Sequence, residues 1–139
     1  MCERDYAYTK RIEGVSLADV TARVRAALAT EGFGVLTEID VQATLKKKLG
    51  VERKPYLILG ACNPALAHKA LEIEPPIGVF LPCNVDVFEG DDGCVYVQTP
   101  RPKVMFGLVG NPDMRPIAEE VDAKLLSCIE FWRPWWTEG

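Results

Sequence analysis

The sequence has few of the features that announce a common function. It contains one histidine, no C-x-x-C or H-x-x-x-H spacing of the kind that holds zinc, and no glycine-rich phosphate motif. Its net charge of -4 argues against the electropositive field that is typical of nucleic-acid binding. We therefore expect no metal, no cofactor and no nucleic-acid partner.

Long apolar runs are also absent. No segment approaches the roughly eighteen residues that a membrane span requires. The charged residues of Met1 to Asp5 are followed by no apolar signal-peptide core. The five cysteines are an odd number, and they are expected to be mostly reduced. These features predict a cytoplasmic protein without a membrane partner.

What is present is the composition of an ordinary globular domain. The chain has 139 residues, of which 48% are hydrophobic and 26% are charged, and a chain of this size needs neither metal nor disulfides for stability. We expect one domain over residues 1–131 and a tail over residues 132–139. The aromatic run from Phe131 to Trp136 is costly to leave in water, so we expect it to pack at an interface.

Hydrophobic periodicity and capping residues divide the domain into alternating strands and helices. Ser16 with Asp19 resembles a capping box, Gly32 is suited to a helix end, and Asn63-Pro64 combines an N-cap with a first helical residue. The predicted helices cover residues 16–31, 41–49, 64–73 and 116–131. The predicted strands cover residues 6–13, 33–40, 56–61, 77–81, 85–88 and 94–98.

The order of these elements is β-α-β-α-β-α-β-β-β-α. It predicts an α/β (α+β) two-layer domain, in which a mixed sheet of about five to six strands carries helices mainly on one face. The strands over residues 33–40 and 56–61 are rich in apolar residues, so we expect both to be largely buried.

Two Cys-Asn pairs are the candidate functional centre. Cys62 precedes the predicted start of the helix over residues 64–73, where unsatisfied N–H groups and the helix dipole stabilise a thiolate. Cys83 is followed by Asn84 in the same way that Cys62 is followed by Asn63. The alternative is structural: free cysteines often fill cores, and asparagines often cap helices and turns.

The second pair follows the same predicted helix, so the two thiols are candidates for neighbouring positions. If their Cα atoms lie within about 7 Å, Cys62 and Cys83 are able to form a reversible disulfide. Asn63 and Asn84 each offer an amide donor and acceptor for a ligand.

His68 falls toward the margin of the apolar face of the third predicted helix. We expect it on the rim of the site, as a candidate ligand contact and not as a metal ligand, because Cys62, Cys83 and His68 lack the usual ligand spacing. One basic cluster, Lys46 to Lys48 with Arg53 and Lys54, suits the end of the second helix, and an anion site is the alternative.

Four segments together carry a resemblance to a known family. They are Gly32-Phe33-Gly34-Val35-Leu36, Lys48-Leu49-Gly50-Val51, Ile58-Leu59-Gly60-Ala61-Cys62-Asn63-Pro64 and Leu81-Pro82-Cys83-Asn84-Val85. In this order and spacing, over about residues 6 to 127, they resemble the bacterial and archaeal family known as domain of unknown function 302 (DUF302). The resemblance implies a compact α/β fold and homodimers, and it implies no particular activity.

Three hypotheses remain at this stage. The first is a non-enzymatic homodimeric module that binds a small molecule or a protein partner at Cys62, Asn63, Cys83 and Asn84. The second is a thiol-dependent enzyme or redox sensor that uses Cys62 with Cys83. The third assigns the two pairs to the fold and the dimer alone.

Overall fold

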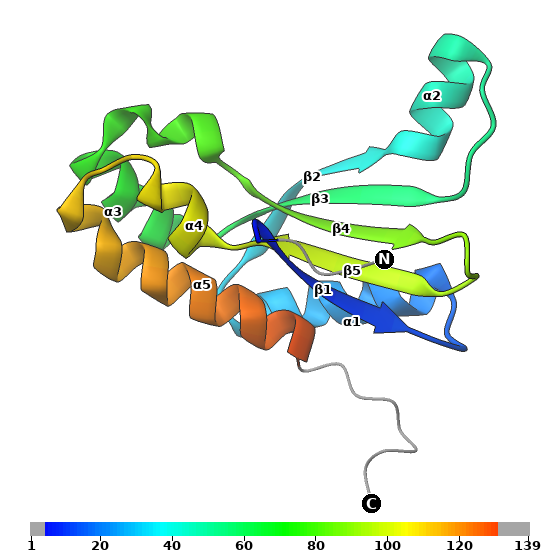
Figure 1. Ribbon diagram of the computed structural model, residues 1–139, viewed down its shortest axis with the longest axis horizontal. Helices are drawn as coiled ribbons and strands as arrows, with labels where there is room; N and C mark the ends of the chain where they lie inside the picture. Colours follow the sequence, from blue (N-terminus) through cyan, green and yellow to red (C-terminus); the bar gives the residue numbers. More distant parts are fainter. Residues whose placement is uncertain (1–4, 131–139) are drawn as a thin grey trace, which may run out of the picture.

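An antiparallel five-stranded sheet forms the centre of the computed structural model, which describes residues 5–130 (Figure 1). The strand order is β1-β5-β4-β3-β2, and every neighbouring pair is antiparallel. The strands are β1 (Ala7–Ile12), β2 (Gly34–Asp40), β3 (Tyr56–Cys62), β4 (Cys83–Glu89) and β5 (Val95–Pro100). The aromatic tail predicted over residues 132–139, with Phe131, lies outside the described residues.

The described chain contains five α-helices and two short 3₁₀ helices; the first four of these seven helices connect strands, and the last three follow β5. They are α1 (Leu17–Thr30), α2 (Val41–Leu49), α3 (Pro64–Ile73), η1 (Pro75–Phe80), α4 (Pro102–Gly107), η2 (Pro112–Met114) and α5 (Arg115–Glu130). Helices α1 and α5 pack against each other and against strands β1, β4 and β5, on one face of the sheet (Figure 1). The predicted α+β class, with helices mainly on one face, is confirmed.

The predicted caps explain where α1 begins and ends. The Ser16 hydroxyl accepts a hydrogen bond from the backbone N–H of Asp19 at 3.1 Å. Val20, Val24 and Leu28 recur at helical spacing on the buried stripe of α1. Gly32 follows the helix with a φ of +82°, a conformation that a side chain would disfavour. Local sequence signals are therefore enough to position this helix.

The core lies between the sheet and the helices α1, α3 and α5. One buried carboxylate links three elements at its edge, because Asp122 of α5 accepts a hydrogen bond from the Tyr8 hydroxyl at 2.5 Å and another from the backbone N–H of Lys103 at 3.3 Å. Such satisfied buried polar groups fix the relative positions of β1, α4 and α5.

Two predicted features of the sheet are wrong. The segment over residues 77–81 is not a strand, because Pro75 and Pro76 start the 3₁₀ helix η1, in which Ile77 is buried. The sheet is also antiparallel throughout and not mixed, since α2 returns β3 beside β2 instead of crossing over to a parallel position. A further helix, α4, lies in the stretch beyond Thr99 that reads as irregular from its prolines and glycines.

Strand β2 and helix α2 form an arm that projects from the body of the domain (Figure 1). The prediction that residues 33–40 are largely buried is wrong: Phe33 is buried, but no residue of β2 or α2 is. Leu36 is 68% exposed and Leu49 is 70% exposed. The physical reason is that β2 is an edge strand, and α2 extends beyond it instead of covering it.

The face of the sheet opposite α1 and α5 carries a second, smaller apolar cluster. The rings of Tyr56, Phe88 and Tyr96 stack across β3, β4 and β5, with centroids 4.7 Å and 5.4 Å apart. Arg53 lies over the Tyr56 ring at 5.2 Å from its centroid.

Between residues 5 and 130 no helix is both long and apolar enough to cross a membrane.

Candidate functional site

The first Cys-Asn pair joins β3 to α3. The Asn63 side-chain oxygen accepts a hydrogen bond from the backbone N–H of Leu66 at 3.3 Å, and the predicted N-cap is confirmed. Its side-chain nitrogen donates to the backbone carbonyl of Glu31 at 3.2 Å, just after α1. Because the Asn63 amide serves as both donor and acceptor within the fold, it ties the end of α1 to the start of α3.

The second pair opens β4 beside β3. In the register of the two strands, Cys83 lies opposite Ala61 and Asn84 lies opposite Gly60. Cys83 is buried and Asn84 is exposed, as expected for successive strand residues that point to opposite faces. The fold therefore brings the two pairs together on adjacent strands, as diagonal neighbours.

The two thiols differ in their environments and are not joined. Cys62 and Cys83 are both free, Cys62 is half-buried, and Cys83 is only 6% exposed. Burial raises the pKa of Cys83 to about 11, and Cys62 adds to this rise. A group with this pKa is a neutral thiol at physiological pH, so Cys83 has the character of a core residue.

A small apolar cavity lies between the two pairs and the helices α3 and α5. It measures about 30 Å³, and its wall includes Cys62, Asn63, Cys83, Leu66, Phe106 and Ile117. This volume is close to that of one water molecule. The space that both pairs share is therefore too small to hold an organic ligand in this conformation.

A larger hollow lies beside Pro82 and Cys83 and extends onto the face of the sheet opposite α1 and α5. It has a volume of about 420 Å³, within the usual range of ligand sites. Its polar residues include Asn84, Asp86 and Gln98, and its apolar residues include Ala7, Phe80 and Met105. Of the two Cys-Asn pairs, only the second contributes to this hollow.

Asp86 is the functional candidate that sequence reasoning missed. It lies on the central strand β4, opposite Ile58 of β3 and Gln98 of β5. Its Oδ2 accepts a hydrogen bond from the Tyr56 hydroxyl at 3.0 Å. Its Oδ1 is inaccessible to solvent and has no hydrogen-bond partner. The sequence did contain a signal, because Asp86 is the single polar residue of the strand predicted over residues 85–88 and lies between Val85 and Val87.

Burial sets the electrostatics of this carboxylate. It raises the pKa of Asp86 above its ordinary value, and the hydrogen bond from Tyr56 offsets part of that rise. Burial and the neighbouring Asp86 also raise the pKa of Tyr56 to about 12, so the Tyr56 hydroxyl keeps its proton and donates it to the hydrogen bond. Asp86 is thus a carboxylate whose lost hydration is only partly replaced.

His68 is not brought to either Cys-Asn pair. It is exposed on α3, where its Nε2 lies 3.8 Å from a carboxylate oxygen of Glu72. It lines a separate surface depression with Glu72 and Ile73. Within residues 5–130, no group of three or more histidine, cysteine, aspartate or glutamate side chains is placed to hold a metal ion.

The basic cluster is dispersed among different partners. Lys46 pairs with Glu52 at 3.3 Å, and Lys54 donates a hydrogen bond to the backbone carbonyl of Gly90 at 3.1 Å. Lys46 to Lys48 occupy the last turn of α2, where positive charge complements the helix C-terminus. This arrangement favours the helix-end interpretation over an anion site.

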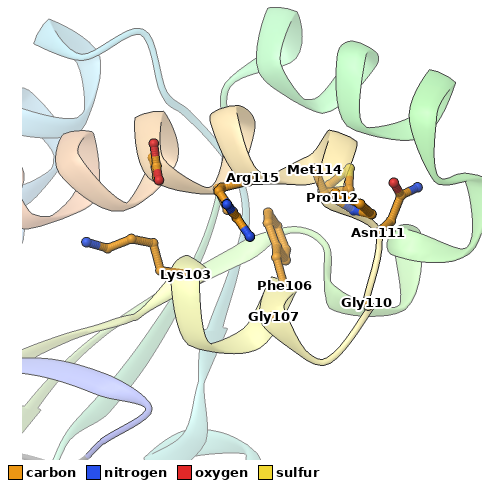
Figure 2. Close-up of a pocket in the computed structure, with 10 residues that line it drawn as sticks. Lys103, Phe106, Gly107, Gly110, Asn111, Pro112, Met114 and Arg115 are labelled. Carbon is orange, nitrogen blue, oxygen red and sulfur yellow. The ribbon is translucent and has the colours of Figure 1, made fainter.

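Another hollow, of about 360 Å³, lies between α4 and the beginning of α5. Figure 2 shows the Arg115 side chain reaching toward the Phe106 ring, whereas the Lys103 side chain extends away from that ring. Glu119 also lines the hollow. Neither Cys-Asn pair contributes to it, and its charged residues are of both signs. With two basic residues and one acidic residue it carries one net positive charge, which by itself identifies no class of ligand.

The family model and a solved structure that match this chain carry the same family name. The model of "Domain of unknown function DUF302" matches residues 8–131. A crystal structure of an uncharacterised conserved DUF302 protein from Bacillus stearothermophilus is 29% identical, with a TM-score of 0.86, and the match covers 94% of this chain and 100% of that one. An uncharacterised protein of Aquifex aeolicus (strain VF5) is 24% identical over 134 residues, covering 94% of this chain and 86% of the relative.

Proposed function

Since this chain belongs to the DUF302 family, whose description assigns no activity, we propose from its geometry that it is a homodimeric module that binds a small molecule beside its second Cys-Asn pair. The observation that carries the proposal is the 420 Å³ hollow next to Cys83 and Asn84. A hollow of this size, with apolar walls and a few convergent polar groups, is the usual form of a ligand site.

The first pair supports this site from behind. Asn63 holds α3 against the end of α1, and the cavity that Cys62 and Cys83 share is nearly filled. The segment from Leu81 to Cys83 separates that cavity from the larger hollow, because these residues line both. In this proposal Cys62 and Asn63 fix the position of the binding segment, while Asn84 faces the ligand and His68 takes no part.

Occupancy of the hollow is tested by filling it. Asn84→Trp places a large side chain at an exposed position in the hollow, without altering the core. Lys103→Trp is the matched control, because it fills the hollow between α4 and α5. In a ligand-observed NMR screen of small fragments, we expect the wild type and Lys103→Trp to bind the same fragments and Asn84→Trp to lose them. Loss in Lys103→Trp alone, or no fragment binding to the wild type, contradicts the proposed site.

The arm formed by β2 and α2 supports the homodimer. Leu36 and Leu49 are each about two-thirds exposed, Ile39 is 48% exposed, and β2 leaves one edge of the sheet unpaired within the described chain. An exposed edge strand with apolar side chains is a template for association with a second chain. We assign the arm to contact with a second copy.

The solution mass tests this assignment. The monomer has a mass of 15.4 kDa, so we expect light scattering after size-exclusion chromatography to give about twice that value. Leu36→Asp should return the mass to that of the monomer. Leu108→Asp changes a leucine that is 79% exposed outside the arm, and should leave the dimer intact. A monomeric wild type, or equal effects of the two variants, rules out the arm as the dimer contact.

The thiol-dependent alternative has less support. A thiol-dependent enzyme or redox sensor needs a reactive thiolate or a pair of cysteines that oxidise readily. Cys83 is buried with a raised pKa, and it lies opposite Ala61 instead of Cys62.

The proposal keeps the protein in the cytoplasm, where free thiols stay reduced.

A further inference from the structure

Two residues that line the hollow, Asp86 and Thr99, each have a buried side-chain oxygen without a hydrogen-bond partner, and only Asp86 carries a charge when it is ionised. Burying a carboxylate without full hydrogen bonding costs free energy, because the water that it loses is not replaced. One oxygen of Asp86 has Tyr56 as its partner, while Oδ1 has neither a partner nor contact with solvent. An unsatisfied buried group of this kind in a folded protein requires a physical explanation.

None of the described residues supplies a cation that neutralises this carboxylate. Asp86 forms no salt bridge with any described residue. The arginines of the same face are engaged elsewhere: Arg11 pairs with Asp92 at 3.0 Å, and Arg53 lies over the Tyr56 ring. Within residues 5–130, no neighbouring side chain therefore balances the charge of Asp86.

The hollow beside Asp86 is suited to a cation with an apolar part. Among the described residues that line it, Asp86 is the one aspartate, glutamate, histidine, lysine or arginine. Most of the remaining wall is apolar, with Ala7, Phe80 and Met105 among its residues. A single negative charge beside largely apolar walls attracts positive charge, because those walls screen it less than water does.

A metal ion does not fit this arrangement. Calcium and magnesium prefer six or more oxygen ligands, and zinc prefers four ligands from cysteine, histidine or carboxylate groups. The hollow offers one carboxylate, and residues 5–130 contain no cluster of three potential ligands. An organic ammonium group requires only one carboxylate and a few neutral acceptors, which Asp86 and Asn84 provide.

We propose that the hollow binds a small primary ammonium compound, whose charged group pairs with Asp86 and whose apolar part contacts Phe80 and Met105. This inference rests on the binding site proposed above and names its ligand class. Rotation of the carboxylate about its last side-chain bond, a soft torsion, turns the unpaired oxygen toward the ligand. An ammonium group bound there would lower the pKa of Asp86 again, because a nearby positive charge favours the ionised form.

The test compares two probes of nearly equal shape. Phenethylammonium carries a positive charge, and 2-phenylethanol replaces the ammonium group with a neutral hydroxyl. Dissociation constants are measured by titration with each probe, following the amide signals of β4 in NMR spectra of the full chain. Because a charge-assisted hydrogen bond adds about 1.5–3 kcal/mol, we expect the wild type to bind the ammonium at least about tenfold more tightly than the alcohol.

Asp86→Asn removes the charge and preserves the shape. It should abolish the preference for the ammonium while leaving the affinity for the alcohol unchanged. Asp91→Asn removes a carboxylate from the exposed turn between β4 and β5, and should keep the preference. A thermal melt of each variant establishes that it is folded, and Asn84→Trp should block both probes.

The outcomes separate this inference from the proposed function. Equal binding of both probes by the wild type, or an unchanged preference in Asp86→Asn, overturns the assignment of an ammonium ligand but leaves the hollow as a binding site. Binding of neither probe overturns both. A change of solution mass in Asp86→Asn without a change in ammonium affinity also overturns the inference, because it would assign Asp86 to the subunit contact.

Discussion

Because Cys83 is buried, its rate of alkylation in the native protein tests whether it is a reactive thiol. The perturbation is alkylation of the native protein with iodoacetamide, a reagent that reacts with the thiolate and not with the thiol. Cys83 begins β4, where it is only 6% exposed and has a pKa of about 11, against an ordinary value of 9.0. The structure therefore predicts slow modification at this position.

The size of the effect follows from the pKa. A rise of two units lowers the thiolate fraction at pH 8 by about 100-fold, and the greater nucleophilicity of the more basic thiolate recovers roughly eightfold of that loss. The net prediction is that Cys83 reacts about tenfold more slowly than a cysteine in an unstructured peptide, before any steric protection is counted. The rate should continue to rise with pH up to about pH 11.

The assay is quantitative mass spectrometry after a short alkylation pulse. Cleavage after Glu89 separates the peptide of Cys83 from that of Cys94. An unstructured cysteine peptide in the same tube sets the reference rate, and protein unfolded in urea should approach that rate at Cys83. The reasoning is refuted if Cys83 of the folded protein reacts as fast as the peptide. That result would restore the thiol-dependent alternative.

Three further predictions concern stability. Asn63→Ala should lower the free energy of unfolding by about 1–2 kcal/mol in urea titrations, because the cap of α3 is lost. Asn63→Asp should recover the part of this loss that is due to capping. Equal stability of the wild type and both variants contradicts the assigned role. Gly60→Ala should lower the free energy of unfolding by about 1–3 kcal/mol, because the new Cβ collides with the Thr37 hydroxyl. Adding Thr37→Ala to this variant should recover most of the lost stability. If the losses of the two single variants simply add in the double variant, the collision is disproved. Burial raises the folded-state pKa of Asp86, so its ionisation opposes folding as the pH rises through that pKa. Asp86→Asn should therefore be more stable than the wild type by about 1 kcal/mol at pH 7 and should show no gain near pH 3. A gain in stability that is independent of pH would exclude this cause.

Local sequence signals predicted α1, α2, α3 and α5 well because the causes of those helices are local, although α4 was missed. The Ser16 and Asn63 caps lie next to the helices that they start, and Gly32 and Gly50 follow the helices α1 and α2. The strand over residues 77–81 was wrong for a related reason. Its apolar residues fit a strand, but the two preceding prolines favour a helical turn, and the buried position of Ile77 satisfies either form.

Burial of strands was less predictable from the sequence. Residues 33–40 and 56–61 each hold enough apolar residues to cover at least one face of a strand, yet β3 lies inside the sheet and β2 is an exposed edge. Composition reports what a strand can bury, and not whether another element covers it. Strand order, which depends on contacts between distant segments, decides this.

The candidate site divides in the same way. The sequence by itself determined that Asn63 caps a helix and that Cys62 and Cys83 belong to segments of one family pattern. Only the tertiary structure placed those segments on adjacent strands, left His68 outside them, and set Asp86 beside a hollow with one oxygen unpaired. The physical reason is that a cap depends on residues a few positions apart, whereas a hollow and the hydration of a carboxylate depend on which distant segments pack around it.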